Sequence, residues 1–135
     1  MHISATVRNS GSLHEATVAT SGVTKAVAIP ANVGRPGSSV NGGELLMLAL
    51  ATCYGNDLYR EAARLGVVVR GLEVIAEADF EGVGMAAMNI RYRARVDSSS
   101  SAQEIQRLLV ETDAVAEIHN TVRAGVSVVL ERWEK

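Results

Sequence analysis

The chain has 135 residues, of which 47% are hydrophobic and 21% are charged, a composition typical of one globular domain that spans residues 1–135. Its 13 basic and 15 acidic residues give a formal net charge of −2, so charge offers no reason to expect nucleic acid or an anionic membrane as a partner. The single cysteine excludes an internal disulfide and a cysteine-based zinc cluster.

The N-terminal third predicts three short strands. Residues 2–8 and 13–20 are rich in Thr and Val and flank a turn at Asn9-Ser10-Gly11, and residues 23–29 form a third strand that Pro30 closes. The first residues lack the basic start and apolar core of a signal peptide. We therefore expect a cytoplasmic location.

A long helix is predicted from Glu44 to Leu65, ended by Gly66. Residues 45–51 are apolar on every side, so this half is expected to be buried all round. The longest apolar run, from Leu45 to Cys53 with Thr52 interrupting it, is about half the roughly 20 residues that cross a bilayer, so it does not predict a membrane span.

Residues 67–80 and 86–96 predict a hairpin, because apolar and polar side chains alternate in both segments. The polar faces carry acids on the first strand and Arg91, Arg93 and Arg95 on the second. The arginine row is either an anion-binding surface or, as we favour, a solvated face paired with the opposite acids.

Ser101-Ala102-Gln103-Glu104 has the spacing of a capping box. It opens a second amphipathic helix that Gly125 ends, and residues 126–133 predict a final strand. The element order β-β-β-α-β-β-α-β predicts an α+β fold with a mainly antiparallel sheet.

Cys53 lies in the middle of the long helix. A buried cysteine usually behaves as a small hydrophobic residue with a raised pKa, whereas a reactive one needs partial exposure and a nearby cation. The candidate cations are Arg35, Arg8 and Arg123, all near loops.

Three stretches of the sequence resemble the OsmC/Ohr family of osmotically inducible and organic hydroperoxide resistance proteins. They are IPANVGRPG at 29–37, NGGELL at 41–46 with ALATC at 49–53, and NTVRAGV at 120–126. The resemblance covers nearly the whole chain. It implies an OsmC-like intertwined homodimer, in which a sheet wraps around long central helices, and thiol-dependent reduction of organic hydroperoxides.

The resemblance places the peroxidatic cysteine at Cys53 and the resolving cysteine at Ala116, which has no thiol. The family's catalytic glutamate falls on Gly43, and Glu44 is the next residue. Glu44 and Cys53 would lie about 13.5 Å apart along one helix, so only Glu44 of the partner subunit is expected to approach Cys53. Arg8 and Arg35 are equal candidates for the catalytic arginine.

His119 falls on the apolar stripe of the second predicted helix. It could act as a base or hold the thiolate near Cys53, but a half-buried histidine bonded to the backbone is the more common arrangement, and we favour it. The three histidines and nearby acids form no recognised metal spacing, so we expect neither a metal nor a cofactor.

Three functions follow from these features. The first is a one-cysteine peroxidase that acts on a small-molecule organic peroxide and is recycled by an external thiol reductant. The second is a non-enzymatic OsmC-like dimer that binds a small apolar or acidic ligand. The third is a structural, stress-associated dimer with an inert Cys53.

Overall fold

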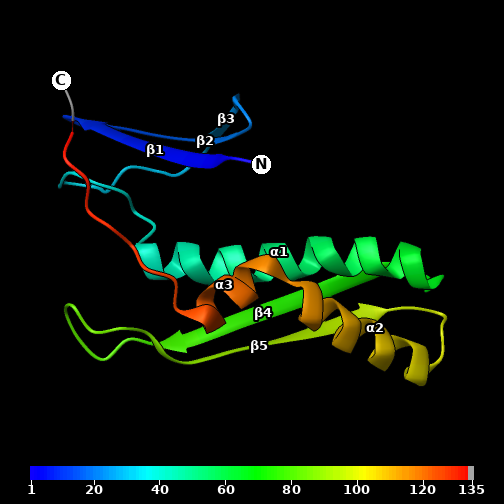
Figure 1. Cartoon of the computed structure of the whole chain (residues 1–135). Coiled ribbons are helices and arrows are strands. Elements are labelled where there is room, and N and C mark those ends of the chain that lie inside the picture. Colours follow the sequence, from blue (N-terminus) through cyan, green and yellow to red (C-terminus); the bar gives the residue numbers. More distant parts are fainter. Residues whose placement is uncertain (134–135) are drawn as a thin grey trace. The chain divides into compact units, whose positions relative to one another are not determined.

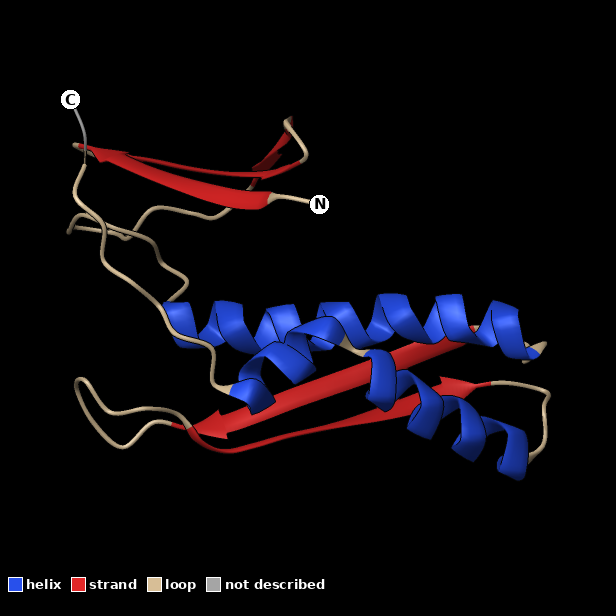
Figure 2. Cartoon of the chain, viewed as in Figure 1, coloured by secondary structure: helices blue, strands red, loops and turns tan. Residues whose placement is uncertain are grey.

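The computed structural model describes residues 1–133 as eight helices and strands in the order β1-β2-β3-α1-β4-β5-α2-α3 (Figures 1 and 2). The predicted mixed α+β fold with antiparallel sheets is confirmed. The chain divides into two compact units, Met1–Leu45 and Leu46–Lys135. That residues 1–135 make a single domain stays a prediction.

The first unit contains a three-stranded antiparallel sheet of β1 (Ile3–Ser10), β2 (Leu13–Thr20) and β3 (Val23–Val27). Ser10 pairs with Leu13, and Gly11 takes the left-handed φ of 58° that the tight turn between them requires. The three predicted strands are confirmed, with ends shifted by one or two residues. All residues of β1 and β3 are exposed, so this sheet has no core of its own within one chain.

Helix α1 spans Gly42–Leu65, close to the predicted bounds. Gly66 ends it with a φ of 70°, and the Val67 N–H donates to the Ala62 carbonyl at 2.9 Å, as in a Schellman motif. The expected all-round burial of residues 45–51 is wrong for the single chain. Leu50 is 2% exposed, whereas Leu48 is 60% exposed, because the second unit covers only one side of the helix.

The hairpin of β4 (Gly71–Asp79) and β5 (Met88–Asp97) is antiparallel, as predicted. One face packs against the buried residues of the helices; its members are Leu72, Val74, Tyr92, Ala94 and Val96. On the other face Arg95 pairs with Glu73 at 2.8 Å and Arg93 with Glu77 at 2.5 Å. The arginine row is therefore matched by acids, which is the arrangement that we favoured.

The second predicted helix forms as two helices, α2 (Ala102–Val115) and α3 (Glu117–Ala124). The capping box of Ser101 and Glu104 is present, and Gly125 ends α3 with a φ of 59°. Ala116 breaks the helix because its ψ of 100° is extended rather than helical. The break turns the chain so that α3 starts beside the middle of α1 (Figure 1).

The strand predicted at 126–133 is wrong for the single chain, because these residues have no regular secondary structure. Val128, Leu130 and Trp133 are at least 94% exposed. A strand needs a hydrogen-bonded neighbour, and within residues 1–133 this segment pairs with none.

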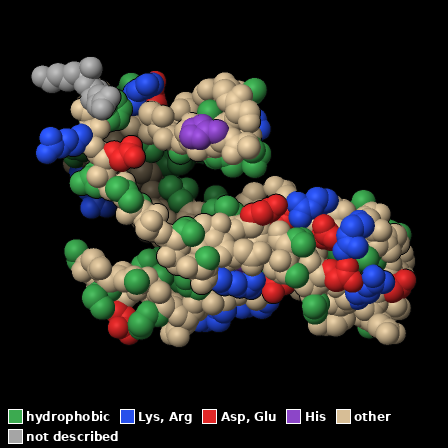
Figure 3. Space-filling view, in the orientation of Figure 1, with side chains coloured by type: hydrophobic (Ala, Val, Ile, Leu, Met, Phe, Trp, Pro, Cys, Tyr) green, Lys and Arg blue, Asp and Glu red, His purple; other side chains and the backbone are tan. Residues whose placement is uncertain are grey.

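Leu58 and Leu108 are fully buried and join α1 and α2 in the core of the second unit. Acidic and basic side chains gather on the surface of the same helices (Figure 3), where Arg64 pairs with Glu61 at 2.6 Å and Arg107 with Glu111 at 2.6 Å. None of the helices described combines the length and apolar character needed to cross a membrane.

Candidate functional site around Cys53

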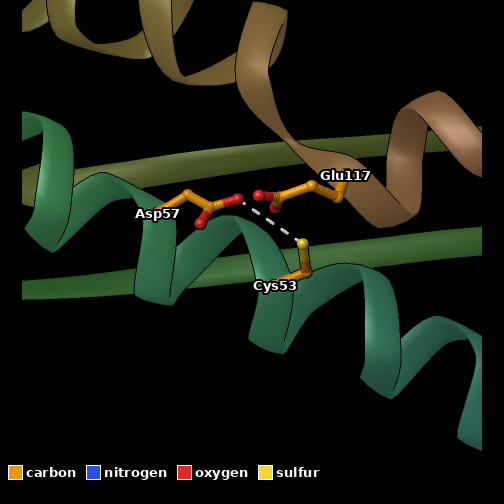
Figure 4. Close-up of side chains that lie close together, drawn as sticks. All are labelled: Cys53, Asp57 and Glu117. Carbon is orange, nitrogen blue, oxygen red and sulfur yellow. Dashed lines mark hydrogen bonds between the residues drawn. The ribbon is translucent and has the colours of Figure 1, made fainter. Parts of the chain in front are cut away.

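Cys53 lies on the face of α1 toward the start of α3, and its side chain is partly exposed (Figure 4). The Sγ–H donates a hydrogen bond to Oδ2 of Asp57 at 3.5 Å. Asp57 follows Cys53 by four residues, so the helical repeat places both side chains on one face. The carboxylate that receives the thiol's bond is itself only 5% exposed.

The N-terminus of α3 completes the surroundings of the sulfur. Glu117 is the first residue of α3, and its carboxylate, the Asp57 carboxylate and the Cys53 sulfur lie within 4.8 Å of one another. The backbone of Ile118, the second residue of α3, acts to lower the pKa of the thiol. Because Ala116 breaks the helix, Ile118 lies in the first turn of α3, where backbone N–H groups have no intrahelical partner.

Arg60 supplies the positive charge of this cluster. Its Nη1 lies 2.7 Å from Oδ1 of Asp57 and 4.0 Å from Oε1 of Glu117, and its Nε lies 3.2 Å from Glu61. One series of contacts thus joins a thiol, a guanidinium and the carboxylates of Asp57, Glu61 and Glu117. Cys53, Asp57 and Glu117 are residue types that ligate metals, and Arg60 already pairs with both carboxylates, so a metal ion would compete with its single positive charge.

Burial raises the pKa of the Cys53 thiol above its ordinary value. The Ile118 N–H acts in the opposite direction because it stabilises the thiolate, and the negative charges of Asp57 and Glu117 raise the pKa again. The resting side chain is therefore a protonated thiol at neutral pH. A thiolate forms only when the proton passes to an acceptor, and Asp57 is already hydrogen-bonded to that proton.

His119 is 3% exposed and packs against two tyrosine rings, with centroid distances of 5.7 Å to Tyr54 and 4.3 Å to Tyr92. Neither ring nitrogen has a hydrogen-bond partner among residues 1–133. The favoured prediction of a half-buried, backbone-bonded histidine is therefore wrong on both points. Burial first, and the charge of Arg123 second, lower the pKa of His119, so the ring is neutral at pH 7.

The other predicted site residues lie in the first unit. Arg8 is on β1 opposite Glu15, and Arg35 is exposed in the loop closed by the Ala31–Ser38 bridge. Glu44 caps α1: its carboxylate accepts from the Asn41 N–H at 2.7 Å, and its own N–H donates to the Asn41 side chain at 2.9 Å. The structure thus gives Glu44 a helix-capping role. The participation of Arg8, Arg35 and Glu44 in catalysis stays a prediction.

Sequence reasoning missed Asp57, Arg60 and Glu117 as neighbours of Cys53. The spacing of Asp57 at four residues after Cys53, and of Arg60 three residues further, was a signal that could have found two of them. Glu117 could not be found this way, because its position depends on the break at Ala116.

Fold and site together define a small α+β protein with one cysteine in a polar cluster on a central helix. A family profile described as OsmC-like protein matches residues 35–131, and the chain belongs to this family. A search of curated proteins finds no match.

Three solved structures show the same fold at low sequence identity. An OsmC-like protein from Mycoplasma pneumoniae is 16% identical with a TM-score of 0.63, covering 90% of this chain and 86% of that one. An organic hydroperoxide resistance protein OsmC from Legionella pneumophila is 16% identical with a TM-score of 0.60, covering 91% and 90%. An organic hydroperoxide resistance protein from Elizabethkingia anophelis is 17% identical with a TM-score of 0.61, covering 91% and 89%.

Proposed function

We propose that this protein reduces organic hydroperoxides by a one-cysteine, thiol-dependent mechanism with Cys53 as the nucleophile. The observation that carries the proposal is the series of contacts from the Cys53 thiol to Asp57 at 3.5 Å and from Asp57 to Arg60 at 2.7 Å. It provides a nucleophile, a proton acceptor and a positive charge side by side. The names of similar structures, which include organic hydroperoxide resistance proteins, support the substrate class.

In the first step the Cys53 sulfur attacks the terminal oxygen of the hydroperoxide while its proton passes to Asp57. The S–O bond forms as the O–O bond breaks, and the leaving alkoxide takes the proton from Asp57 and departs as an alcohol. Cys53 is oxidised to a sulfenic acid and the peroxide is reduced. Arg60 positions the Asp57 carboxylate, and the Ile118 N–H steadies the negative charge on sulfur.

Recycling requires an external thiol, because the chain contains one cysteine. One thiol attacks the sulfenic acid, which gives a mixed disulfide and water. A second thiol attacks that disulfide, which restores Cys53 and releases the oxidised reductant as its own disulfide.

We also propose that the functional form is a homodimer. We propose a cytoplasmic location for it. The homodimer is supported by apolar side chains that are exposed to solvent in a single chain. Leu48 on α1 is 60% exposed, and Val128 and Leu130 after α3 are 98% and 99% exposed. Large uncovered apolar side chains on several elements are typical of protein interfaces.

A second candidate is a non-enzymatic family member that binds a small ligand and keeps Cys53 inert. The raised pKa of the Cys53 thiol favours it, because reactive cysteines normally have a lowered pKa. The two candidates differ in one observable, which is whether Cys53 is oxidised by a hydroperoxide in the folded protein.

Whole-protein mass spectrometry after brief exposure to cumene hydroperoxide tests the proposal. We expect a rapid gain of one oxygen atom that dimedone traps at Cys53, and no gain in Cys53→Ser. Asp57→Asn should slow the reaction, whereas Asp97→Asn, which alters the exposed Arg70–Asp97 pair, should react like the wild type. A folded wild-type protein that gains no oxygen under excess peroxide would establish the inert alternative.

A further inference from the structure

A second buried carboxylate lies near the cluster around Cys53. Glu61 on α1 is 6% exposed, and glutamates are almost never buried unless they are paired. Glu61 follows Cys53 by eight residues, which corresponds to about 12 Å along the helix axis. Glu61 can therefore act on the sulfur at close range only through another side chain.

Arg60 is the side chain that connects Glu61 with the site. Its Nε lies 3.2 Å from Oε1 of Glu61, and its Nη1 lies 2.7 Å from Oδ1 of Asp57. Arg60 thus occupies one oxygen of Asp57, and the other, Oδ2, accepts the hydrogen bond from the Cys53 thiol at 3.5 Å. The same guanidinium lies 4.0 Å from Glu117. Its position therefore decides how much uncompensated negative charge faces the sulfur.

Glu61 is the fixed partner of Arg60. The Arg60 side chain is 50% exposed, and an ion pair of a long exposed side chain is weakened by rotamer entropy and by water. The Glu61 carboxylate is only 8% exposed, and Nε of Arg64 lies 2.6 Å from its other oxygen. Arg64 in turn pairs with Glu111 on α2. The carboxylate is therefore held between two guanidiniums and tied to a second helix.

We propose that Glu61 is a positioning residue that holds the Arg60 guanidinium against Asp57. With Arg60 in this place, the negative charge beside the sulfur is compensated, and Asp57 keeps the orientation in which Oδ2 faces the thiol. Without it, the carboxylates of Asp57 and Glu117 face Cys53 uncompensated. This role rests on the function proposed for Cys53, but its effect on the thiol is measured without a peroxide.

The direction of the effect on Cys53 separates a positioning role from a direct electrostatic one. If Glu61 acts only through its own negative charge, a neutral side chain in its place lowers the pKa of the Cys53 thiol. If Glu61 holds Arg60, the same substitution releases the guanidinium. The nearby carboxylates then oppose the thiolate more strongly, and the pKa of the thiol rises.

The test is the pH dependence of Cys53 alkylation by iodoacetamide in the full chain. In Glu61→Met, which has a side chain of similar length and forms neither ion pair, the pH of half-maximal rate should rise by about half a unit. Glu61→Gln keeps a carbonyl oxygen for Arg60 and should give a smaller rise. Glu73→Met removes an exposed acid that pairs with Arg95, and it should match the wild type.

Arg60→Gln supplies the decisive comparison. It should raise the pH of half-maximal alkylation by itself, and Glu61→Met added to it should not raise that pH further, because the guanidinium that Glu61 holds is already gone. An unchanged or lower value in Glu61→Met would overturn the proposal. An equal rise in the Arg60→Gln background would overturn it too, because Glu61 would then act without Arg60.

Glu61→Gln keeps the proposal testable if circular dichroism shows that Glu61→Met does not fold. Its smaller rise should likewise disappear in the Arg60→Gln background, and a rise that persists there would overturn the proposal. Cumene hydroperoxide separates this role from the proposed function. A wild-type protein that shows the expected alkylation values but is not oxidised by the peroxide would refute peroxide reduction and support the positioning role of Glu61.

Discussion

The sulfur of Cys53 lies 3.5 Å from Oδ2 of Asp57, one turn further along the same helix. The carboxylate both raises the pKa of the thiol and offers the acceptor to which its proton can pass. These two effects act against each other in any reaction of Cys53. Removal of the Asp57 charge should therefore separate them.

Asp57→Asn is expected to lower the pKa of Cys53, because a negative charge next to the forming thiolate disappears. Alkylation by iodoacetamide should accordingly reach half its maximal rate at a lower pH than in the wild type. Reaction with cumene hydroperoxide at neutral pH should slow nevertheless, because the proton acceptor is lost. If the alkylation rate depends on pH in the same way in Asp57→Asn and in the wild type, Asp57 has little influence on the pKa of Cys53.

His119 should make stability depend on pH below about 6.5. Its pKa is lowered in the fold, so the unfolded chain binds more protons once the pH falls below the usual value of about 6.5. Stability is full above that pH, falls as the pH drops, and levels off below the folded pKa. The slope contributed by one proton is at most about 1.4 kcal/mol per pH unit.

Urea unfolding at several pH values measures this effect. His119→Gln should flatten the pH dependence in this window, and His14→Gln should retain it. An equal slope in the His119 variant would assign the pH dependence to other groups.

Gly55→Ala should stabilise the protein by about 0.5–1 kcal/mol, because glycine is a poor residue for a helix interior. A β-carbon at Gly55 would meet Leu72 Cδ1 at 3.5 Å and Val74 Cγ2 at 3.8 Å, which are ordinary van der Waals contacts. The midpoint of thermal unfolding should rise. A lower midpoint would mean that α1 and β4 cannot accept the added methyl group.

The hairpin and the long helix were predictable from sequence because their signals are local. Period-2 alternation marks β4 and β5, and Gly66 marks the end of α1. The segment 126–133 has strand-forming composition, but pairing depends on a neighbour outside the segment. Its structure in one chain could not be predicted from its own residues.

The candidate site was only partly predictable for the same reason. Cys53 was identified from the ALATC stretch at 49–53. Glu117 lies next to Cys53 only because the extended backbone of Ala116 redirects the chain between α2 and α3. No periodic pattern in the sequence predicts a helix break within an amphipathic stretch. Within the second unit the guanidinium next to Asp57 comes from Arg60 on the same helix, while a catalytic role for Arg8 or Arg35 stays a prediction.

Leu48→Asp tests the proposed homodimer. The side chain is 60% exposed in one chain, so the substitution should leave a monomer folded. In a dimer that covers Leu48, a buried unpaired charge should weaken association by several kcal/mol. Sedimentation equilibrium should show a wild-type dimer and a largely monomeric variant, and a stable wild-type monomer at micromolar concentration would contradict the dimer.

Ala116→Cys should create a disulfide with Cys53. Ala116 is fully buried and directly precedes Glu117, whose carboxylate lies within 4.8 Å of the Cys53 sulfur. Its position in the family resemblance is that of the resolving cysteine. A disulfide needs Cα atoms about 4.4–6.8 Å apart, and the added sulfur should cost at most about 1–3 kcal/mol through overpacking.

Under mild oxidation the Ala116→Cys variant should lose both free thiols without becoming a covalent dimer, and dithiothreitol should restore them. Thiol titration with and without denaturant, together with non-reducing electrophoresis, measures this outcome. Ser101→Cys, placed at the start of α2, is the matched control and should keep two thiols. If Ala116→Cys also keeps two, Cys53 is either misaligned with residue 116 or unreactive, and the predicted disulfide is wrong.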